Sequence, residues 1–305
     1  MSVETPQWRS DLTLTLPTDR EFALYQALVH REAGIFLGDT KRHLLAARLA
    51  PRLRQLGLKS LTQYYERVVD DSEGEELIRL LDLVSTNETH FFREPAHFEF
   101  LRTRVLPTWA ADADAGRRER RIRVWSTACS TGQEPYTLAM VLREQFGADS
   151  GWDLEIVATD ISTRVLRQAE TALWPAEKGK DIPTPLLKKY MMRGIGPQTG
   201  KMRAAPEIRS MVKFQRMNLN DVEYPLTGSF DLVFCRNVLI YFSAEGRSAV
   251  LGRLLQRLTP GGFLFLGHAE SVQGVHQSRV RTVFPTVYTH AANGGARTSL
   301  VAMSG

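Results

Sequence analysis

The feature that most constrains the fold is a change of hydrophobic period near residue 120. Before it, apolar residues recur at helical spacing; after it, short apolar runs alternate with helical stretches. The runs that indicate strands are Ile122–Ser126, Leu154–Thr159, Val212–Met217, Phe230–Cys235, Phe263–Leu266 and a final Thr282–Thr289. Helical patterns between them cover Pro135–Phe146, a stretch that starts at Ser162, and Glu245–Leu258. This alternation predicts an α/β fold with a doubly wound, mostly parallel sheet covered by helices on both faces.

The first part of the chain predicts a small all-helical domain. Helical spacing begins at Asp19, which we expect to be the N-cap, and continues from Thr40 to Leu56 with Gly57 as its stop. Ser60 is the expected cap of a third helix, and Glu75–Val84 is the fourth.

A length of 305 residues favours more than one domain. We expect a flexible leader at 1–17, the helical basic domain at 18–90, the α/β domain at 91–290 and a disordered tail at 291–305. The roughly forty residues between the helix after Asp160 and the strand at Val212 are too many for an ordinary connection. Among them, residues 186–212 contain two short strands around tight turns. They predict a small antiparallel β insertion on the sheet's edge.

Composition narrows the class of protein. No apolar run approaches the length of a membrane span, and the first residues lack the layout of a signal peptide. The two cysteines, Cys129 and Cys235, lie far apart, which fits a reducing cytoplasm. No His, Cys, Asp or Glu cluster has metal-ligand spacing, so no metal is expected. A net charge of +5 favours an acidic partner.

Ligands of doubly wound sheets bind beyond the carboxyl ends of the strands. The loop after the first strand has small residues but no GxGxxG pattern, which argues against a dinucleotide. Its Glu134 suits an ammonium or ribose hydroxyl, or merely favours the helix N-terminus. Asp160, after the second strand, suits ribose hydroxyls, or caps a helix that Ser162 can also cap. Because Asp160 lies at a strand exit, its replacement by alanine is expected to leave the fold intact.

The third and fourth strands exit into Asn218–Leu219 and Arg236–Asn237, which could frame an adenine ring or simply form turns. Together the exits describe an adenosine site without a phosphate cradle, as S-adenosylmethionine requires. A bare adenosine-binding module is the alternative. Upstream, Asn87, Thr89 and Arg93 lie on a segment that reads as a second polar group or as a capping loop.

Several motifs resemble those of the chemotaxis receptor methyltransferases, in that family's order and spacing, and the resemblance covers about Asp19 to Tyr288. The motifs are Asn87–Glu94, Cys129–Tyr136, Ala158–Ile161, Phe230–Phe242 and Leu266–Glu270. The resemblance implies methyl transfer from S-adenosylmethionine to glutamate side chains of chemoreceptors, which forms γ-methyl esters in chemosensory adaptation. S-Adenosylhomocysteine would be the product.

By the same resemblance, the cofactor contacts are Asn87, Thr89, Arg93, Glu134, Asp160, Asn218, Leu219, Arg236 and Asn237. Arg93 and Tyr241 match the pair of polar residues near the transferred methyl group. Gln133 departs from the family, in which many members have glutamate, and Pro51 interrupts the basic second helix.

That second helix carries cations and no acids between Lys41 and Lys59. Lys41, Arg48 and Arg52 share one of its faces, and a receptor bearing glutamates makes this a docking face; RNA is the competing partner. Gly194 and Gly196 form the turn of the β insertion, which resembles the part of some members that tethers a receptor's C-terminal peptide. A structural flap is the alternative there.

Two other functions remain open from sequence. One is an RNA or small-molecule methyltransferase on the same fold. The other is a non-catalytic cofactor-binding adaptor, against which the presence of Arg93 and Tyr241 counts.

Overall fold

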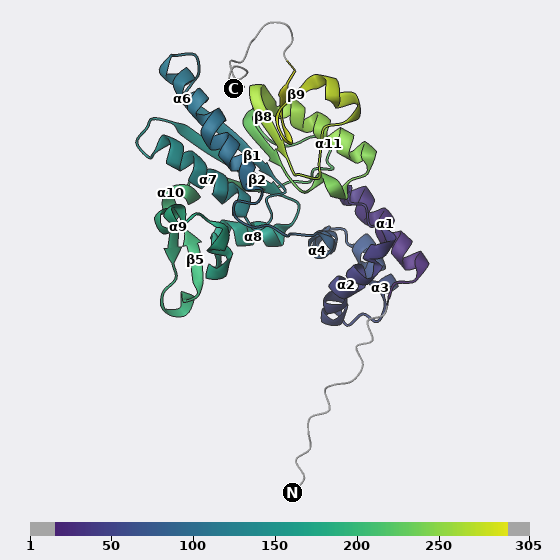
Figure 1. The fold of residues 1–305 in the computed structure, drawn as a ribbon. Coiled ribbons are helices and arrows are strands. Elements are labelled where there is room, and N and C mark those ends of the chain that lie inside the picture. Colours follow the sequence, from purple (N-terminus) through teal and green to yellow (C-terminus); the bar gives the residue numbers. More distant parts are fainter. Residues whose placement is uncertain (1–15, 292–305) are drawn as a thin grey trace. The chain divides into compact units, whose positions relative to one another are not determined.

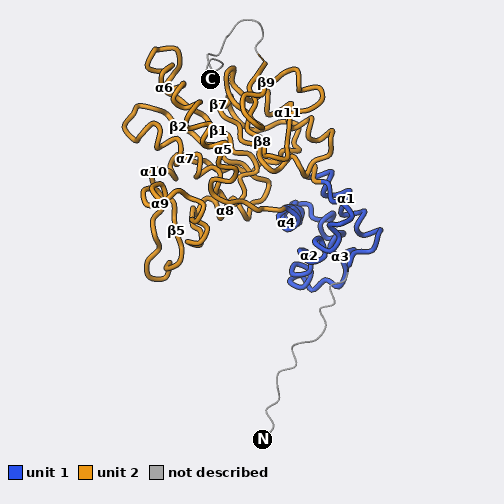
Figure 2. The backbone as a smooth tube through the Cα atoms, viewed as in Figure 1, with its two compact units in different colours: residues 1–32, 36–85 blue, residues 33–35, 86–305 orange. Residues whose placement is uncertain are grey.

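The computed structural model describes residues 16–291, which form two compact units (Figure 2). The first unit contains the chain up to residue 32 and residues 36–85, and the second contains residues 33–35 and the chain from residue 86 onward. The expected leader and tail fall almost entirely outside the described residues. Across residues 16–291, none of the helices combines the length and the apolar character needed to cross a membrane.

The first unit is all-helical. Its helices are α1 (Asp19–Ala33), the 3-10 helix η1 (Asp39–Lys41), α2 (Arg42–Leu56), α3 (Leu61–Asp70) and α4 (Glu75–Val84). Two sequence predictions are confirmed: Gly57 ends α2 in the left-handed region (φ 68°), and the Ser60 side chain caps α3 by accepting the Gln63 amide.

The predicted cap of α1 is wrong by one position. Thr18, rather than Asp19, caps this helix, because Thr18 Oγ1 accepts the Glu21 amide at 3.2 Å. Glu21 Oε2 in turn accepts the Thr18 amide at 2.9 Å. This reciprocal pair satisfies two backbone donors that the helix end would otherwise leave free.

The second unit is built on a seven-stranded sheet (Figure 1). In spatial order its strands are β6 (Val212–Arg216), β2 (Asp153–Asp160), β1 (Arg121–Thr127), β7 (Phe230–Cys235), β8 (Leu258–Leu266), β10 (Val287–His290) and β9 (Val280–Phe284). The first five are parallel to one another, which confirms the predicted doubly wound arrangement.

The last strand predicted from sequence, Thr282–Thr289, is in fact two strands. The chain reverses at Pro285 and Thr286, the latter with φ 57°, and β10 then pairs antiparallel with both β9 and β8. Apolar residues continue through this reversal, so the hydrophobic pattern gave no sign of the turn.

Alternate residues of the strands belong to two separate cores, one on each face of the sheet. Val124 and Phe234 lie in one core, whereas their neighbours Trp125 and Cys235 lie in the other. Residues of α5, η2, α6, α7 and α10 join the first core, and residues of α11 join the second. These helices are α5 (Pro95–Phe100), the π-helix η2 (Leu101–Val105), α6 (Leu106–Asp114), α7 (Gln133–Phe146), α10 (Pro206–Arg209) and α11 (Ala244–Arg257).

The connection after α8 (Thr163–Thr171) carries the β insertion. It is a three-stranded antiparallel sheet in the order β3 (Leu173–Pro175), β5 (Lys201–Ala204) and β4 (Met191–Arg193). Sequence predicted β4 and β5 but missed β3, which is only three residues long and precedes the expected range. The remaining short helices are η3 (Ala176–Asp181), α9 (Thr184–Tyr190), η4 (Gly196–Gln198), η5 (Leu239–Tyr241) and η6 (Gly274–Arg279).

Candidate active site

The candidate site lies where the parallel strands end. Because β6, β2, β1, β7 and β8 are neighbours in that order, the segments that follow them meet at one edge of the sheet. These segments begin at Met217, Ile161, Ala128, Arg236 and Gly267. Four of the five contain or adjoin residues that sequence had singled out.

Backbone strain concentrates at this edge. Seven non-glycine residues of the described chain have positive φ. Five of them, Phe92, Glu94, Ala128, Ser130 and Asn237, belong to the segment before α5 and to the loops after β1 and β7. Left-handed backbone is costly for residues with a side chain, and such residues cluster at functional sites. The strain therefore marks the same edge as the strand exits.

Asp160 ties the loop after β1 to the end of β2. Its carboxylate is buried, with only 5% of the residue exposed. Its Oδ2 accepts the Ser130 amide at 2.8 Å, and its Oδ1 accepts the Ser162 amide at 2.9 Å. The Ser162 side chain caps α8, as predicted. Asp160 thus supports the architecture of the site as well as facing it, so the expectation that its loss leaves the fold intact does not fit these bonds.

Asn87 joins this group through Ser130, whose Oγ donates to the Asn87 carbonyl oxygen at 3.0 Å. The Asn87 side-chain nitrogen Nδ2 is buried and has no hydrogen-bond partner in residues 16–291. Buried polar atoms are nearly always bonded in folded proteins. Asn87 therefore offers a donor that a bound ligand would satisfy.

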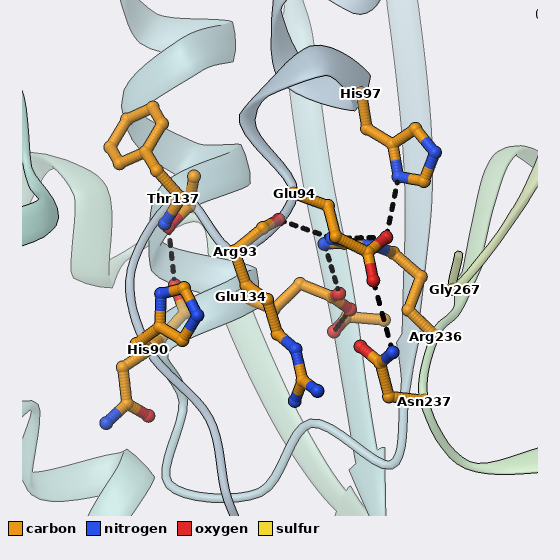
Figure 3. Close-up of polar contacts among 12 residues, drawn as sticks. His90, Arg93, Glu94, His97, Glu134, Thr137, Arg236, Asn237 and Gly267 are labelled. Atoms are coloured by element: carbon orange, nitrogen blue, oxygen red, sulfur yellow. Dashed lines mark hydrogen bonds and ion pairs between the residues drawn. The ribbon is translucent and has the colours of Figure 1, made fainter. Parts of the chain in front are cut away.

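Arg236 lies between two carboxylates (Figure 3). Its Nη1 is 3.1 Å from Glu134 Oε2, and its Nη2 is 3.0 Å from Glu94 Oε2 and also donates to the Arg93 carbonyl oxygen. Only 2% of the Arg236 side chain is exposed. Asn237 Nδ2 donates to the other Glu94 oxygen at 3.1 Å. Arg236 and Glu94 thereby join the segment before α5 to the first turn of α7 and to the loop after β7.

The ionised forms of the two carboxyl groups that share Arg236, Glu134 and Glu94, are not equally stabilised. Burial raises the pKa of Glu134, and this effect exceeds the opposing ones of Arg236 and of the Ser126 hydroxyl. Burial acts on Glu94 as well, but Arg236 and Asn237 outweigh it, and the pKa of Glu94 is lowered. An additional positive charge beside Glu134 would therefore stabilise its ionised form. An ammonium group of a ligand supplies such a charge.

The other predicted residues occupy less definite positions. Asn218 Oδ1 accepts the Asn220 amide at 2.9 Å, which is the turn-forming role, and the Leu219 side chain belongs to the second core. Arg93 is partly buried and donates to the Glu88 carbonyl oxygen at 3.0 Å. Thr89 and Tyr241 are also partly buried, and within the described chain the Tyr241 hydroxyl has no hydrogen-bond partner.

The fold also assembles a trio that sequence spacing could not show. Glu94, His97 and His268 place one possible metal-ligand atom each within 4.8 Å of one another. Burial, with the nearby Arg236, lowers the pKa of His97 to about 4, so this ring is neutral at pH 7. A cation bound to Glu94 would, however, meet the Arg236 guanidinium already there. We assign the trio to a polar cluster around Glu94, whose Oε1 accepts the His268 backbone amide at 3.2 Å.

In the helical unit, two of the three predicted docking cations have partners within the unit. Arg48 Nη1 donates to the carbonyl oxygens of Val84 and Ser85. Arg52 forms an ion pair with Glu76, whose side chain is 7% exposed. Lys41 is exposed. The predicted face therefore presents less free charge than its sequence indicates.

In the β insertion, Gly194 and Gly196 have different constraints. A Cβ at Gly194 would lie 2.0 Å from the Gln198 carbonyl oxygen, so the turn itself requires glycine there. Gly196 has φ +56° and open space around its Cα. Both residues shape the turn, and nothing in their surroundings by itself indicates a ligand.

Sequence reasoning gave no role to two acids of this site, Glu94 and Glu270. Glu94 holds Arg236 and Asn237, and buried Glu270 accepts backbone amides from the loops after β7 and β8. Both stand inside motifs that the family resemblance rests on. The sequence signal that could have found them is an acid just before a predicted helix or shortly after a predicted strand, where a carboxylate can accept several backbone amides.

Comparison with known proteins identifies both units. The family described as "CheR methyltransferase, all-alpha domain" matches residues 20–85, and "CheR methyltransferase, SAM binding domain" matches residues 87–289. The chain is 38% identical to chemotaxis protein methyltransferase 2 of Pseudomonas aeruginosa, over 90% of this chain and 94% of that protein. It is 38% identical to chemotaxis protein methyltransferase of Escherichia coli K12, over 83% and 85% of the two chains. For the protein of the same name from Borreliella burgdorferi the values are 33%, 94% and 99%.

Proposed function

The chain belongs to the CheR methyltransferase family, and we propose that it methylates glutamate side chains of chemoreceptors to γ-methyl esters, with S-adenosylmethionine as methyl donor. The reaction serves chemosensory adaptation in the cytoplasm. The observation that carries the proposal is the Glu134–Arg236–Glu94 arrangement beside Asp160, at the carboxyl edge of a parallel sheet.

The residues at this edge fit the cofactor. Burial raises the pKa of Glu134 despite the neighbouring Arg236, so its carboxylate would gain from a second cation and would hold the ammonium group of the cofactor. Asp160, whose two oxygens accept the Ser130 and Ser162 amides, would hold the ribose hydroxyls. Asn87, with its unpartnered Nδ2, and Thr89 would supply further contacts, and Asn218 and Leu219 would lie beside the adenine ring. Arg236 and Asn237 complete the set, Arg236 by holding Glu134 in place.

Bound S-adenosylmethionine supplies an electrophilic methyl group on a sulfonium. A glutamate acceptor is already ionised at neutral pH, so the protein needs no general base. Its task is to align the carboxylate oxygen with the methyl carbon and to exclude water. We assign Arg93 to orienting the acceptor carboxylate, since a guanidinium can donate two parallel hydrogen bonds. We assign Tyr241, whose hydroxyl has no partner in the described chain, to donating a hydrogen bond near the methyl group.

The helical unit is the proposed docking module for the receptor. Lys41, Arg54 and Lys59 are exposed cations on or beside α2, whereas Arg48 and Arg52 make intramolecular contacts. A cationic surface favours encounter with a receptor helix that carries glutamates. We expect Arg48 and Arg52 to support this surface mainly by fixing α2 against α4.

We also propose that the β insertion binds an extended C-terminal peptide of the receptor. β4 is an edge strand of its small sheet, and next to its open edge Met192 and Ile195 are 43% and 83% exposed. An edge strand can pair with a peptide backbone while exposed apolar side chains contact the peptide's own. Such tethering would raise the local concentration of receptor.

Titration with the receptor's C-terminal peptide tests this tether. Ile195→Asp should abolish binding, whereas Val275→Asp, which changes another highly exposed apolar residue, on η6, should not. Gly194 is unsuitable for the test because any side chain there breaks the turn. Equal peptide affinity of the wild-type protein and Ile195→Asp would leave the insertion without this role.

The proposed activity is tested with labelled S-adenosylmethionine and a receptor cytoplasmic fragment. The label should appear in the receptor band, and receptor variants with glutamine in place of the modified glutamates should take up less of it. Labelled RNA or labelled small molecules, with an unlabelled receptor, would favour the alternative methyltransferase. Cofactor binding without any transfer would favour an adaptor.

A further inference from the structure

Glu270 is a buried acid just beyond β8, with 6% of the residue exposed. Its Oε2 accepts the amides of Gly267 at 2.7 Å and of Asn237 at 2.9 Å. Its Oε1 accepts the amide of Leu239 at 2.7 Å and lies 3.4 Å from that of Ile240. A single carboxylate thus binds backbone donors from two segments that are distant in the sequence.

These two segments follow neighbouring strands of the sheet. Gly267 begins the segment after β8, and Asn237, Leu239 and Ile240 lie in the loop after β7. Local backbone bonds in this loop are few: the Tyr241 amide donates to the Val238 carbonyl oxygen and the Phe242 amide to that of Leu239, within the three-residue helix η5 and its caps. Neither of these bonds reaches the segment after β8, and the Glu270 carboxylate provides the bonds that tie the loop to that segment.

The segments around the carboxylate are tightly packed. A Cβ at Gly267 would lie 2.6 Å from Asn237 Nδ2, 2.8 Å from the Asn237 amide nitrogen and 2.9 Å from Glu270 Oε2. Asn237 donates to both acids: its backbone amide donates to Glu270, and its side-chain Nδ2 donates to Glu94. Glu270 and Glu94 thus hold Asn237 from two sides.

Both side-chain oxygens of Glu270 act as hydrogen-bond acceptors. All the groups facing Glu270 are backbone N–H donors, and a carboxylate can accept from each of them. Glutamine has the same shape but would direct its NH₂ group at one pair of these donors. A buried donor left without an acceptor destabilises the local conformation that creates it.

We propose that Glu270 is a positioning residue that sets Asn237 and Tyr241 at the methyl-transfer site by clamping the loop after β7 onto the segment after β8. Asn237 and Tyr241 stand on either side of the clamped amides of Leu239 and Ile240. Loss of the clamp displaces both together. The effect on methyl transfer rests on the proposed function, whereas the clamp itself is measured independently of any activity.

The test uses Glu270→Gln in the full chain, with two controls. Glu119→Gln makes the same chemical change at an exposed site before β1. Leu254→Ala removes a fully buried side chain of α11 from the second core, to which Leu239 also belongs, and lowers stability while every hydrogen bond to Glu270 is retained. Amide hydrogen exchange at Asn237 and Leu239 is measured first, since these amides donate to Glu270.

We expect exchange at these two amides to accelerate in Glu270→Gln by on the order of tenfold or more relative to the amides of β1, while Leu254→Ala changes the whole unit. Per folded molecule, Glu270→Gln should weaken cofactor binding and slow single-turnover transfer, each by on the order of tenfold. Leu254→Ala and Glu119→Gln should retain wild-type values per folded molecule.

Two outcomes overturn the proposal. Unchanged exchange at Asn237 and Leu239 in Glu270→Gln would show that the clamp does not hold the loop. Accelerated exchange with wild-type affinity and rate would show that the clamp does not position the site. If the wild-type protein transfers no methyl group to a receptor, the proposed function fails, and the exchange result still decides the clamp. Gly267→Ala should reproduce the local exchange effect with the carboxylate retained.

Discussion

Replacement of Asp160 separates its two roles, one in the scaffold and one in cofactor binding. The residue is 5% exposed, and the backbone amides of Ser130 and Ser162 donate to its two carboxylate oxygens. Asp160→Ala removes both acceptors and leaves two buried donors. Asp160→Asn keeps one acceptor oxygen and presents an NH₂ group to the other donor.

The magnitudes follow from these bonds. Hydrogen bonds to a charged acceptor contribute about 1.5 to 3 kcal/mol each, so we expect Asp160→Ala to destabilise the second unit by about 2 to 5 kcal/mol, since the two are not additive. Asp160→Asn should cost about 1 to 3 kcal/mol. Loss of a charge-assisted ribose contact should weaken cofactor binding by roughly tenfold to a hundredfold in both variants.

Urea unfolding followed by tryptophan emission measures the first effect. Of the five tryptophans, Trp8 lies outside the described residues, and the other four report on the second unit, in which they lie: Trp109, Trp125, Trp152 and Trp174. Calorimetric titration of folded Asp160→Asn with S-adenosylhomocysteine measures the second. Wild-type affinity in this variant would remove Asp160 from the cofactor site, and wild-type stability of Asp160→Ala would refute the scaffold role.

Three further predictions concern other parts of the chain. Tyr241→Phe should leave cofactor affinity nearly unchanged and slow single-turnover methyl transfer; an equal rate would assign Tyr241 to packing. Arg52→Met should destabilise the helical unit by about 3 to 5 kcal/mol, measured by hydrogen exchange, and a second change, Glu76→Leu, should restore most of it. Because Arg52 lowers the pKa of Glu76, the ion pair contributes its full stability above the unfolded pKa of that carboxyl, and this stability is lost as pH falls through the lowered folded pKa. A difference in stability between wild type and Arg52→Met that does not change with pH would contradict this. Reversing the exposed Lys41 and Arg54 to glutamate should lower receptor methylation and its salt sensitivity without affecting cofactor binding, and full activity at low salt would exclude this face.

Much of the fold was predictable from sequence because period and caps are local signals. Phe230–Cys235 and Glu75–Val84 have in the structure the limits that sequence predicted. Errors occurred where a non-local or single-residue effect decides the outcome. The reversal at Pro285–Thr286 interrupts an apolar run without a glycine, and β3 exists only because β5 pairs with it.

The candidate site was predictable in its location and less so in its internal bonding. Strand exits placed Asp160 and Arg236 at one edge of the sheet, and the structure confirms that placement. Sequence cannot show which charges are already neutralised, because ion pairs such as Arg52–Glu76 and Arg236–Glu94 join residues distant along the chain. Two of the three cations expected to face a partner, Arg48 and Arg52, are therefore found bonded within the protein.

The chemical nature of the methylated product tests the proposed reaction most directly. Receptor fragment labelled by the protein with methyl-labelled S-adenosylmethionine is incubated in mild alkali, and volatile label is collected. We predict that the label is released as methanol, and that mass spectrometry of untreated fragment places the added methyl groups on glutamate side chains. A label that withstands alkali, as methylated amines and nucleobases do, would contradict glutamate O-methylation by this protein.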